Sequence, residues 1–303
     1  MGVPPAPHHP ARLSVGVVGF GRVGATLAVG LQRAGHHVAA VSGATAATRR
    51  RAARTLPDVE VLPAEDVVRR SDAVLLTVPD DALADVVETL AAQGCFRPGQ
   101  LVVHTSGRSG LAVLEPATRA GAAPFALHPA MAFTGAPEDP DRLSGATWGV
   151  TTLPELRAAA EVLVVELGGE PVWVPDEARA VYHAALTWGA SYVVTLETAA
   201  ADLLAGAGVE APQRVLAPLL GAALDNALRH GDAGLTGPIA RGDSGTVAAH
   251  LVALRDRAPE MVPAYVALAR LTADRALQSG RLDAAAAERL LGVLATPAVG
   301  GGA

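Results

Sequence analysis

A glycine-rich turn near the N-terminus, set between two apolar runs, most constrains what this chain can fold into. The run Val15–Val18 predicts a buried parallel strand, a helix follows the turn, and a second strand resumes at His37–Ser42. In such a unit the glycines permit a tight turn and close backbone approach to a pyrophosphate, and the helix N-terminus attracts the anion. The turn is therefore predicted to bind a dinucleotide. Its residues are Gly19, Phe20, Gly21, Arg22, Val23 and Gly24.

The end of the second strand indicates which dinucleotide binds. Enzymes selective for NAD place a carboxylate there, where it accepts hydrogen bonds from the ribose 2′-hydroxyl. This chain has Ser42, Gly43 and Thr45 instead, and Arg49 begins a run of three arginines. A carboxylate would repel a 2′-phosphate, whereas hydroxyl groups and guanidinium groups bind one, so NADP (NADPH) is the expected cofactor. The alternative is that the arginines form a solvated helix face.

Charge is unevenly distributed along the chain. Residues 1–57 hold seven arginines and no carboxylate, although the net charge of the whole chain is −6. A basic segment confined to the first unit fits an anionic nucleotide better than a nucleic acid, which the acidic remainder would repel. The single cysteine, Cys95, excludes a multi-cysteine metal site, and we expect no metal. Without a long apolar stretch or an apolar signal core, the chain is expected to be cytoplasmic, with no membrane partner.

Helix and strand patterns alternate up to about residue 175 and then change. The first part predicts an α/β fold, a Rossmann-type doubly wound and mostly parallel sheet, and the alanine-rich helices that follow predict an all-α C-terminal domain. We expect a disordered tail at 1–11, an NAD(P)-binding domain at 12–175, a helical substrate and dimerisation domain at 176–296 and a flexible tail at 297–303. Apolar positions surround the helix from Ala180 to Leu204, so it should be buried within its domain or in a homodimer.

Polar side chains follow three predicted strands at the sheet edge where ligands bind in folds of this kind. The first strand ends in Thr77, Val78 and Pro79, the second in Thr105 and Ser106, and the third in His128. In the helical part, Arg179 and His183 lie four residues apart on one helix face, and a glycine- and proline-containing loop carries Arg241. The strand-end residues from Thr77 to Thr105 are predicted cofactor contacts, and the others are candidate substrate contacts.

The absence of lysine limits the chemistry that the chain can perform. All 24 basic residues are arginine, which excludes Schiff-base catalysis and the lysine of a nucleotide-triphosphate P-loop. Proton transfer must then come from His, Tyr, Ser, Thr, Asp or Glu, directly or through water.

Several motifs together resemble a bacterial group that pairs a Rossmann-like domain with a helical C-terminal domain of unknown function. The similarity covers about residues 12–280 and includes the glycine turn, TVPDDAL, HTSG, ALHP, YHAA…ASY and TGPIARGD. More distantly, the chain is similar to the superfamily of ketopantoate reductase, pyrroline-5-carboxylate reductase, prephenate dehydrogenase and β-hydroxyacid dehydrogenases. The resemblance implies that the first domain binds NAD(P) and that the second closes the substrate site.

The resemblance also implies roles for individual residues. Thr105 and Ser106 match hydroxyl groups that contact the substrate carboxylate, and His128 matches a histidine that lines the site. Arg179 and His183 take the spacing of a catalytic lysine and asparagine, so His183 is expected to donate a proton, while Arg179 or Arg241 holds the substrate's carboxylate.

The expected function is NADP(H)-dependent reduction of a small carbonyl or imine acid by hydride transfer. The expected assembly is a homodimer formed through the helical domain. One alternative is a non-catalytic NADP-binding or scaffold protein, which the missing lysine–asparagine pair favours. A ketopantoate reductase-like enzyme is the specific enzymatic alternative.

Overall fold

A computed structural model describes residues 12–43 and 45–295 of the chain, so the tails predicted at 1–11 and 297–303 lie outside the described residues. The chain divides into two compact units, residues 1–189 and 190–303. Residues 176–189, which the sequence places with the helical domain, pack with the first unit.

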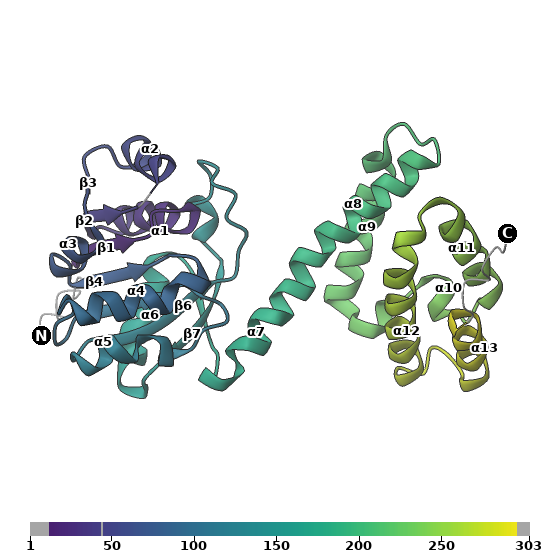
Figure 1. The fold of residues 1–303 in the computed structure, drawn as a ribbon. Helices are drawn as coiled ribbons and strands as arrows, with labels where there is room; N and C mark the ends of the chain where they lie inside the picture. The colour runs from purple at the N-terminus through teal and green to yellow at the C-terminus, as the bar shows by residue number, and fades with distance from the viewer. Residues whose placement is uncertain (1–11, 44, 296–303) are drawn as a thin grey trace, which may run out of the picture. The chain divides into compact units, whose positions relative to one another are not determined.

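The first unit is built on one eight-stranded sheet in the order β3-β2-β1-β4-β5-β6-β7-β8 (Figure 1). Neighbouring strands run parallel except β6 and β7, which pair antiparallel. The order reverses between β1 and β4, the place where doubly wound sheets open a ligand crevice. The strands are β1 (Ser14–Val18), β2 (His37–Ser42), β3 (Glu60–Val61), β4 (Ala73–Leu76), β5 (Leu101–His104), β6 (Ala123–Pro129), β7 (Thr147–Thr152) and β8 (Glu170–Trp173).

Helices cover both faces of this sheet, which is why its central strands read as continuous apolar runs. One face packs Leu27 and Leu31 of α1 together with Leu163 of α6. The other face packs Leu83 and Val87 of α4. The predicted α/β class with a mostly parallel Rossmann-type sheet is confirmed. The helices of this unit are α1 (Arg22–Arg33), α2 (Ala46–Thr55), α3 (Ala64–Arg69), α4 (Asp80–Ala92), α5 (Glu115–Arg119), α6 (Arg157–Glu166) and α7 (Arg179–Leu186).

The second unit is helical throughout its regular elements, as the sequence predicts. Helices α10 to α13 share an apolar core of alanine, leucine and valine side chains, and α8 packs along α9 (Figure 1). A π-helical turn, Thr187–Ser191, precedes α8, at the point where the two units divide. The helices are α8 (Tyr192–Gly206), α9 (Pro212–His230), α10 (Gly237–Ala240), α11 (Ser244–Arg257), α12 (Val262–Gln278) and α13 (Ala284–Ala295).

Helices α8 and α9 bury little of their apolar surface within one copy of the chain. Only Ala201 of α8 and two residues of α9, Pro212 and Leu216, are buried among the described residues. Across 12–43 and 45–295, no helix combines the length and the apolar character needed to cross a bilayer. The exposed apolar side chains of the pair are Val193, Val194, Leu196, Val215, Leu219, Leu224 and Leu228.

Candidate functional site

The turn between β1 and α1 has a different steric requirement at each glycine. Gly19 adopts a left-handed conformation, with φ of +93°, and a Cβ there would lie 2.8 Å from the backbone nitrogen of Val78. A Cβ on Gly24 would lie 2.6 Å from the carbonyl oxygen of Gly19, so this glycine lets α1 pack against the turn. At Gly21, by contrast, no described atom lies within 4 Å of a Cβ position. The turn is closed on its protein side and open at Gly21.

Helix α1 begins directly after this open position. Gly21 is its N-cap, and among the described residues no side chain caps its first N–H groups. An uncapped helix N-terminus beside open space is suited to bind a phosphate, through the free N–H groups and the positive end of the helix dipole. This geometry fits the pyrophosphate of a dinucleotide.

The neighbouring strand ends hold the turn in place. The carbonyl oxygen of Ser42, at the end of β2, accepts hydrogen bonds from the backbone N–H groups of Gly19 and Phe20. The Thr77 hydroxyl, after β4, donates to the carbonyl oxygen of Gly19 over 2.6 Å. Thr77 and Ser42, both predicted to contact the cofactor, therefore lie at the turn and support its shape.

The other predicted cofactor contacts differ in their exposure and in their contacts within the protein. The Thr45 hydroxyl caps α2 by accepting from the backbone N–H of Thr48, while Arg49 and Pro79 are exposed. Val23 packs against the core, and Arg22 extends to the carbonyl oxygen of Phe133, 3.4 Å from its Nη1. Phe20 is buried, and Val78, Gly43 and Thr105 are partly buried near the strand ends.

Two histidines and a tyrosine meet above Gly107, in the loop that follows β5. His128 lies near the end of β6, and Tyr182 and His183 lie on α7. The Tyr182 hydroxyl lies 3.0 Å from Nδ1 of His128, and the two imidazole rings meet edge to face with centroids 5.7 Å apart. A Cβ on Gly107 would overlap the His183 ring and lie 3.0 Å from Nε2 of His128. Only glycine leaves room for this cluster.

The surroundings of His128 keep it neutral at neutral pH. Burial, the guanidinium of Arg179 and the adjacent His183 lower the pKa of His128 to about 4. Burial also raises the pKa of Tyr182, so its phenol stays protonated and can donate to Nδ1 of His128. A hydrogen bond in that direction places the imidazole proton on Nε2, the nitrogen nearest Gly107. His128 then carries an N–H donor at Nε2.

Arg179 is fully buried beneath this cluster and binds protein atoms. Its Nη2 donates to the carbonyl oxygen of Ser106 over 2.6 Å. Its Nη1 lies 3.3 Å from the carbonyl oxygen of Gly149 and 3.1 Å from the Thr151 hydroxyl oxygen. With none of its surface exposed, the guanidinium has no open side for a substrate carboxylate. The contact between Arg179 and a substrate carboxylate, expected from the sequence, stays a prediction, and in this structure the guanidinium binds protein atoms.

The loop after β5 is fixed by hydrogen bonds from two buried residues, His104 and Ser106, and from the exposed Asp176. His104 accepts from the backbone N–H of Ser106 through Nδ1, and its Nε2 lies 3.1 Å from the carbonyl oxygen of Gly110. The Ser106 hydroxyl accepts from the backbone N–H of Ser109, and Asp176 accepts from that of Leu111 over 2.7 Å. These bonds fix the position of Gly107 relative to the rings of His128 and His183.

The structure thus brings Ser106, His128, Arg179 and His183 together within the first unit. Tyr182 also belongs to this cluster, although the sequence did not single it out. Its position beside His183, on a helix expected to carry the proton donor, was the available signal. The fifth candidate, Arg241, lies in the second unit, where it is exposed at the end of α10, and its role remains a prediction.

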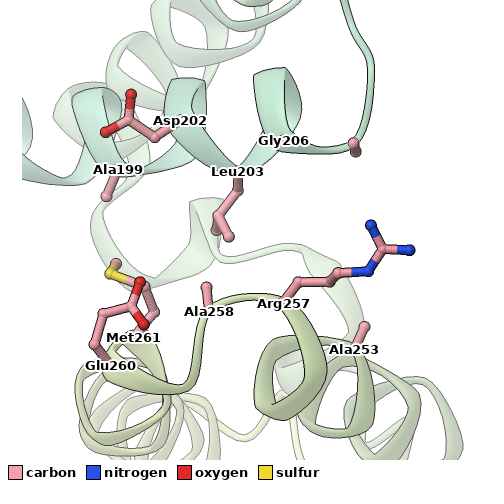
Figure 2. Close-up of a pocket in the computed structure, with 10 residues that line it drawn as sticks. Ala199, Asp202, Leu203, Gly206, Ala253, Arg257, Ala258, Glu260 and Met261 are labelled. Carbon is pink, nitrogen blue, oxygen red and sulfur yellow. The ribbon is translucent and has the colours of Figure 1, made fainter.

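The second unit contains a cavity of about 550 Å³ between α8 and the segment joining α11 to α12. Figure 2 shows Leu203 and Ala258 pointing toward each other across it, while the carboxylate of Asp202 points away. None of the residues predicted to act in catalysis lines this cavity. Its inner wall is mainly apolar and offers no cluster comparable to the histidines above Gly107.

A mostly parallel, doubly wound sheet with a glycine turn and an uncapped helix at its ligand edge defines the Rossmann class of α/β proteins. The chain pairs a domain of this class with a C-terminal DUF2520 domain. Residues 4–129 match the Rossmann-like domain, and residues 146–272 match the domain of unknown function DUF2520. No curated protein shows significant similarity to the chain.

Three solved structures show how widely this fold is shared. A proposed NADP oxidoreductase from Bacteroides fragilis is 20% identical, with a TM-score of 0.72 over 87% of this chain and 98% of that chain. A reductive aminase from Aspergillus terreus is 20% identical, with a TM-score of 0.62 over 93% and 99%. A 1-pyrroline-5-carboxylate reductase from Streptococcus pyogenes is 17% identical, with a TM-score of 0.58 over 88% and 98%. At these identities the likeness shows the fold alone.

Proposed function

We propose that the protein is an NADP(H)-dependent oxidoreductase that reduces a small carbonyl or imine acid. The observation that carries this proposal is the cluster of His128, Tyr182 and His183 above Gly107, at the edge of the sheet that also carries the glycine turn. Parallel strands β1, β4, β5 and β6 end at that edge, so a dinucleotide on the turn and a substrate above Gly107 would share one crevice.

The similar folds support this class of reaction. The reductive aminase and the pyrroline-5-carboxylate reductase are named for reactions at carbon–nitrogen bonds. The protein from Bacteroides fragilis is described as an NADP oxidoreductase. We extend these descriptions to the present chain only as part of the proposal.

Each residue of the cluster would have its own role in the proposed reduction. The cofactor, when bound, supplies the hydride. His183, which is partly exposed, donates the proton that the carbonyl oxygen or imine nitrogen takes up as the hydride arrives at carbon. The neutral His128 donates a hydrogen bond from Nε2 to the reacting group, and Tyr182 fixes the imidazole tautomer that makes this possible. Arg179 holds Ser106 and the strand ends in position without touching substrate.

The choice of NADP over NAD remains part of the proposal. No carboxylate follows β2 at the position where it would bind a ribose 2′-hydroxyl, and the exposed Arg49 lies on the helix that begins there.

A screen of NADPH oxidation against small 2-keto acids and cyclic imine acids tests the function. We expect turnover with at least one compound, reduced by a hundredfold or more in His183→Ala, because a positioned proton donor typically contributes this much. His37→Ala is the matched control, since His37 is an exposed histidine at the start of β2, and it should retain full activity. Tight NADPH binding without turnover on the whole panel would instead favour a non-catalytic NADP-binding protein.

A further inference from the structure

A cavity of the first unit lies on the side of α1 that faces away from the sheet. Its volume is about 640 Å³, within the range of small-molecule sites. It is enclosed by α1, α2 and the loop that follows β6. The lining residues that matter for its chemistry are Arg22 and Thr26 of α1, Arg51, Arg54 and Thr55 of α2, and Gly135 of the loop.

Three arginines line this cavity, and its described lining includes no carboxylate. Arg51 donates through Nη1 to the carbonyl oxygen of Phe20, and Arg22 through Nη1 to that of Phe133. Each has further N–H groups left, and within the described part of the chain Arg54 forms no hydrogen bond or ion pair. The nearby loop carboxylate of Asp139 is buried and accepts from Thr134 and from the backbone N–H of Gly135.

This cavity shares Arg22 with the cofactor turn and extends from there along α1. Its α1 residues are Arg22, Ala25, Thr26 and Val29, whereas Gly24, Leu27, Ala28 and Leu31 face the sheet, and at 100° per residue the two sets occupy opposite sides of the helix. From Arg22 to Val29 the lining extends roughly 10 Å along the axis, away from the helix N-terminus at which a pyrophosphate would bind.

We propose that this cavity binds a phosphorylated small molecule as a second ligand, distinct from the dinucleotide. The positive charges of three arginines around one cavity repel one another, and a phosphate group relieves this repulsion by accepting hydrogen bonds from the N–H groups that the guanidinium groups have left. The cavity's size allows an organic group to accompany the phosphate. The proposal does not depend on the reductase activity proposed above.

Calorimetric titration of the full chain with inorganic pyrophosphate tests the site. The protein is first saturated with NADPH, so that the helix N-terminus is occupied before pyrophosphate is added. We expect one pyrophosphate per chain, with binding at least tenfold weaker in Arg54→Gln. Arg119→Gln is the matched control: it also removes one exposed arginine charge, but from α5, whose Ala117 packs on the opposite face of the sheet. Its binding should equal that of the unaltered chain.

Three results would overturn the proposal. They are the absence of pyrophosphate binding at millimolar concentration, displacement of pyrophosphate by NADPH, and equal weakening in both variants. Normal NADPH affinity and an unchanged circular dichroism spectrum for Arg54→Gln establish that the variant is folded. If NADPH itself fails to bind, the proposed function is at fault, and the two variants compared without NADPH still test the cavity.

Discussion

At the scale of single residues, two histidines make the stability of the first unit sensitive to acid. Burial, together with the nearby Arg179, lowers the pKa of both His104 and His128 to about 4. In the unfolded chain an imidazole has a pKa of about 6.5, so between these values the unfolded state binds more protons than the folded state. Stability is therefore complete above about pH 6.5 and is lost as the pH falls toward 4.

Urea unfolding measured at several pH values checks this prediction. Each buried imidazole would contribute on the order of a few kcal/mol to the loss between pH 6.5 and 4. His128→Gln removes one of the two groups, so its unfolding free energy should depend less steeply on pH than that of the unaltered chain. A free energy of unfolding that stays constant over this interval would contradict the assignment.

The exposed arginines that follow β2 are expected to determine which cofactor the protein prefers. Replacing Arg49 and Arg50 together with alanine should weaken NADPH binding and leave NADH binding nearly unchanged, because only NADPH has a 2′-phosphate. A charge-assisted contact to phosphate contributes about 1.5–3 kcal/mol, equivalent to at least a tenfold change in Kd. Fluorescence titration with both cofactors measures it, and equal effects on the two would assign the arginines to a solvated helix face.

At the scale of secondary-structure elements, Arg179 is the link that joins α7 to the sheet. It reaches carbonyl oxygens that follow β5 and lie within β7, together with the hydroxyl of Thr151. Arg179→Met keeps an apolar side chain of similar length and leaves these buried acceptors without their donor. We expect a loss of about 3 kcal/mol or more in unfolding free energy.

Arg108→Met serves as the comparison for that measurement. Arg108 forms ion pairs with Asp80 and Asp81, but it is half exposed, and exposed ion pairs contribute about 1 kcal/mol or less. Chemical denaturation of both variants should therefore separate them clearly. If Arg179→Met is no less stable than Arg108→Met, the buried hydrogen bonds of Arg179 do not support the fold as described.

How far the sequence predicts these elements depends on whether the signal is local. The glycine turn and the central strands could be predicted, because a tight turn needs glycine and a strand buried on both faces needs a continuous apolar run. The antiparallel pairing of β6 with β7 and the burial of Arg179 could not be predicted. The acceptors of Arg179 are mostly backbone carbonyl oxygens from separate strands. Every residue has a carbonyl group, so the sequence does not indicate which of them will lie near one another in the fold.

The partners of His128 illustrate the same limit within the candidate site. A histidine at a strand end could be placed near the ligand edge from its position alone. The neutral state of the His128 imidazole could not be predicted from the sequence. It follows from burial and from the neighbouring Arg179 and His183, which only the folded chain brings together.

At the scale of the whole molecule, the apolar surface of α8 and α9 leads us to propose a homodimer. Leu219, Leu224 and Leu228 of α9 and Val194 of α8 are each more than half exposed in a single copy. A gathering of exposed apolar side chains on two packed helices is typical of an interface between proteins. A second copy of the chain is the partner that we propose, and the homodimer expected from the sequence stays a prediction.

Light scattering at micromolar concentration distinguishes the two states. The unaltered chain should give about twice the 30.6 kDa mass of one copy, and Leu224→Glu with Leu228→Glu should shift the mass toward a single copy by placing buried charges in the interface. Glu88→Gln, a substitution on the exposed surface of α4, controls for the handling of variants. A single-copy mass for the unaltered chain, with full cofactor binding and activity, would exclude the dimer as the active unit.

The way Arg179 is anchored also determines which mutations this fold can tolerate. Its acceptors at Ser106, Ala126 and Gly149 are peptide carbonyl oxygens, which every amino acid supplies equally. Substituting Ser106 or Ala126 therefore leaves a carbonyl acceptor in place. Exchanging Arg179 for a residue without a side-chain donor removes the hydrogen bonds to all of these acceptors. Gly149 is constrained for a separate reason, since a Cβ there would lie 2.5 Å from the Tyr182 hydroxyl. During evolutionary drift, substitutions at Ser106 keep the carbonyl acceptor, but a change at Thr151 removes the one side-chain acceptor, and the arginine can be exchanged only if the strands are held together in another way.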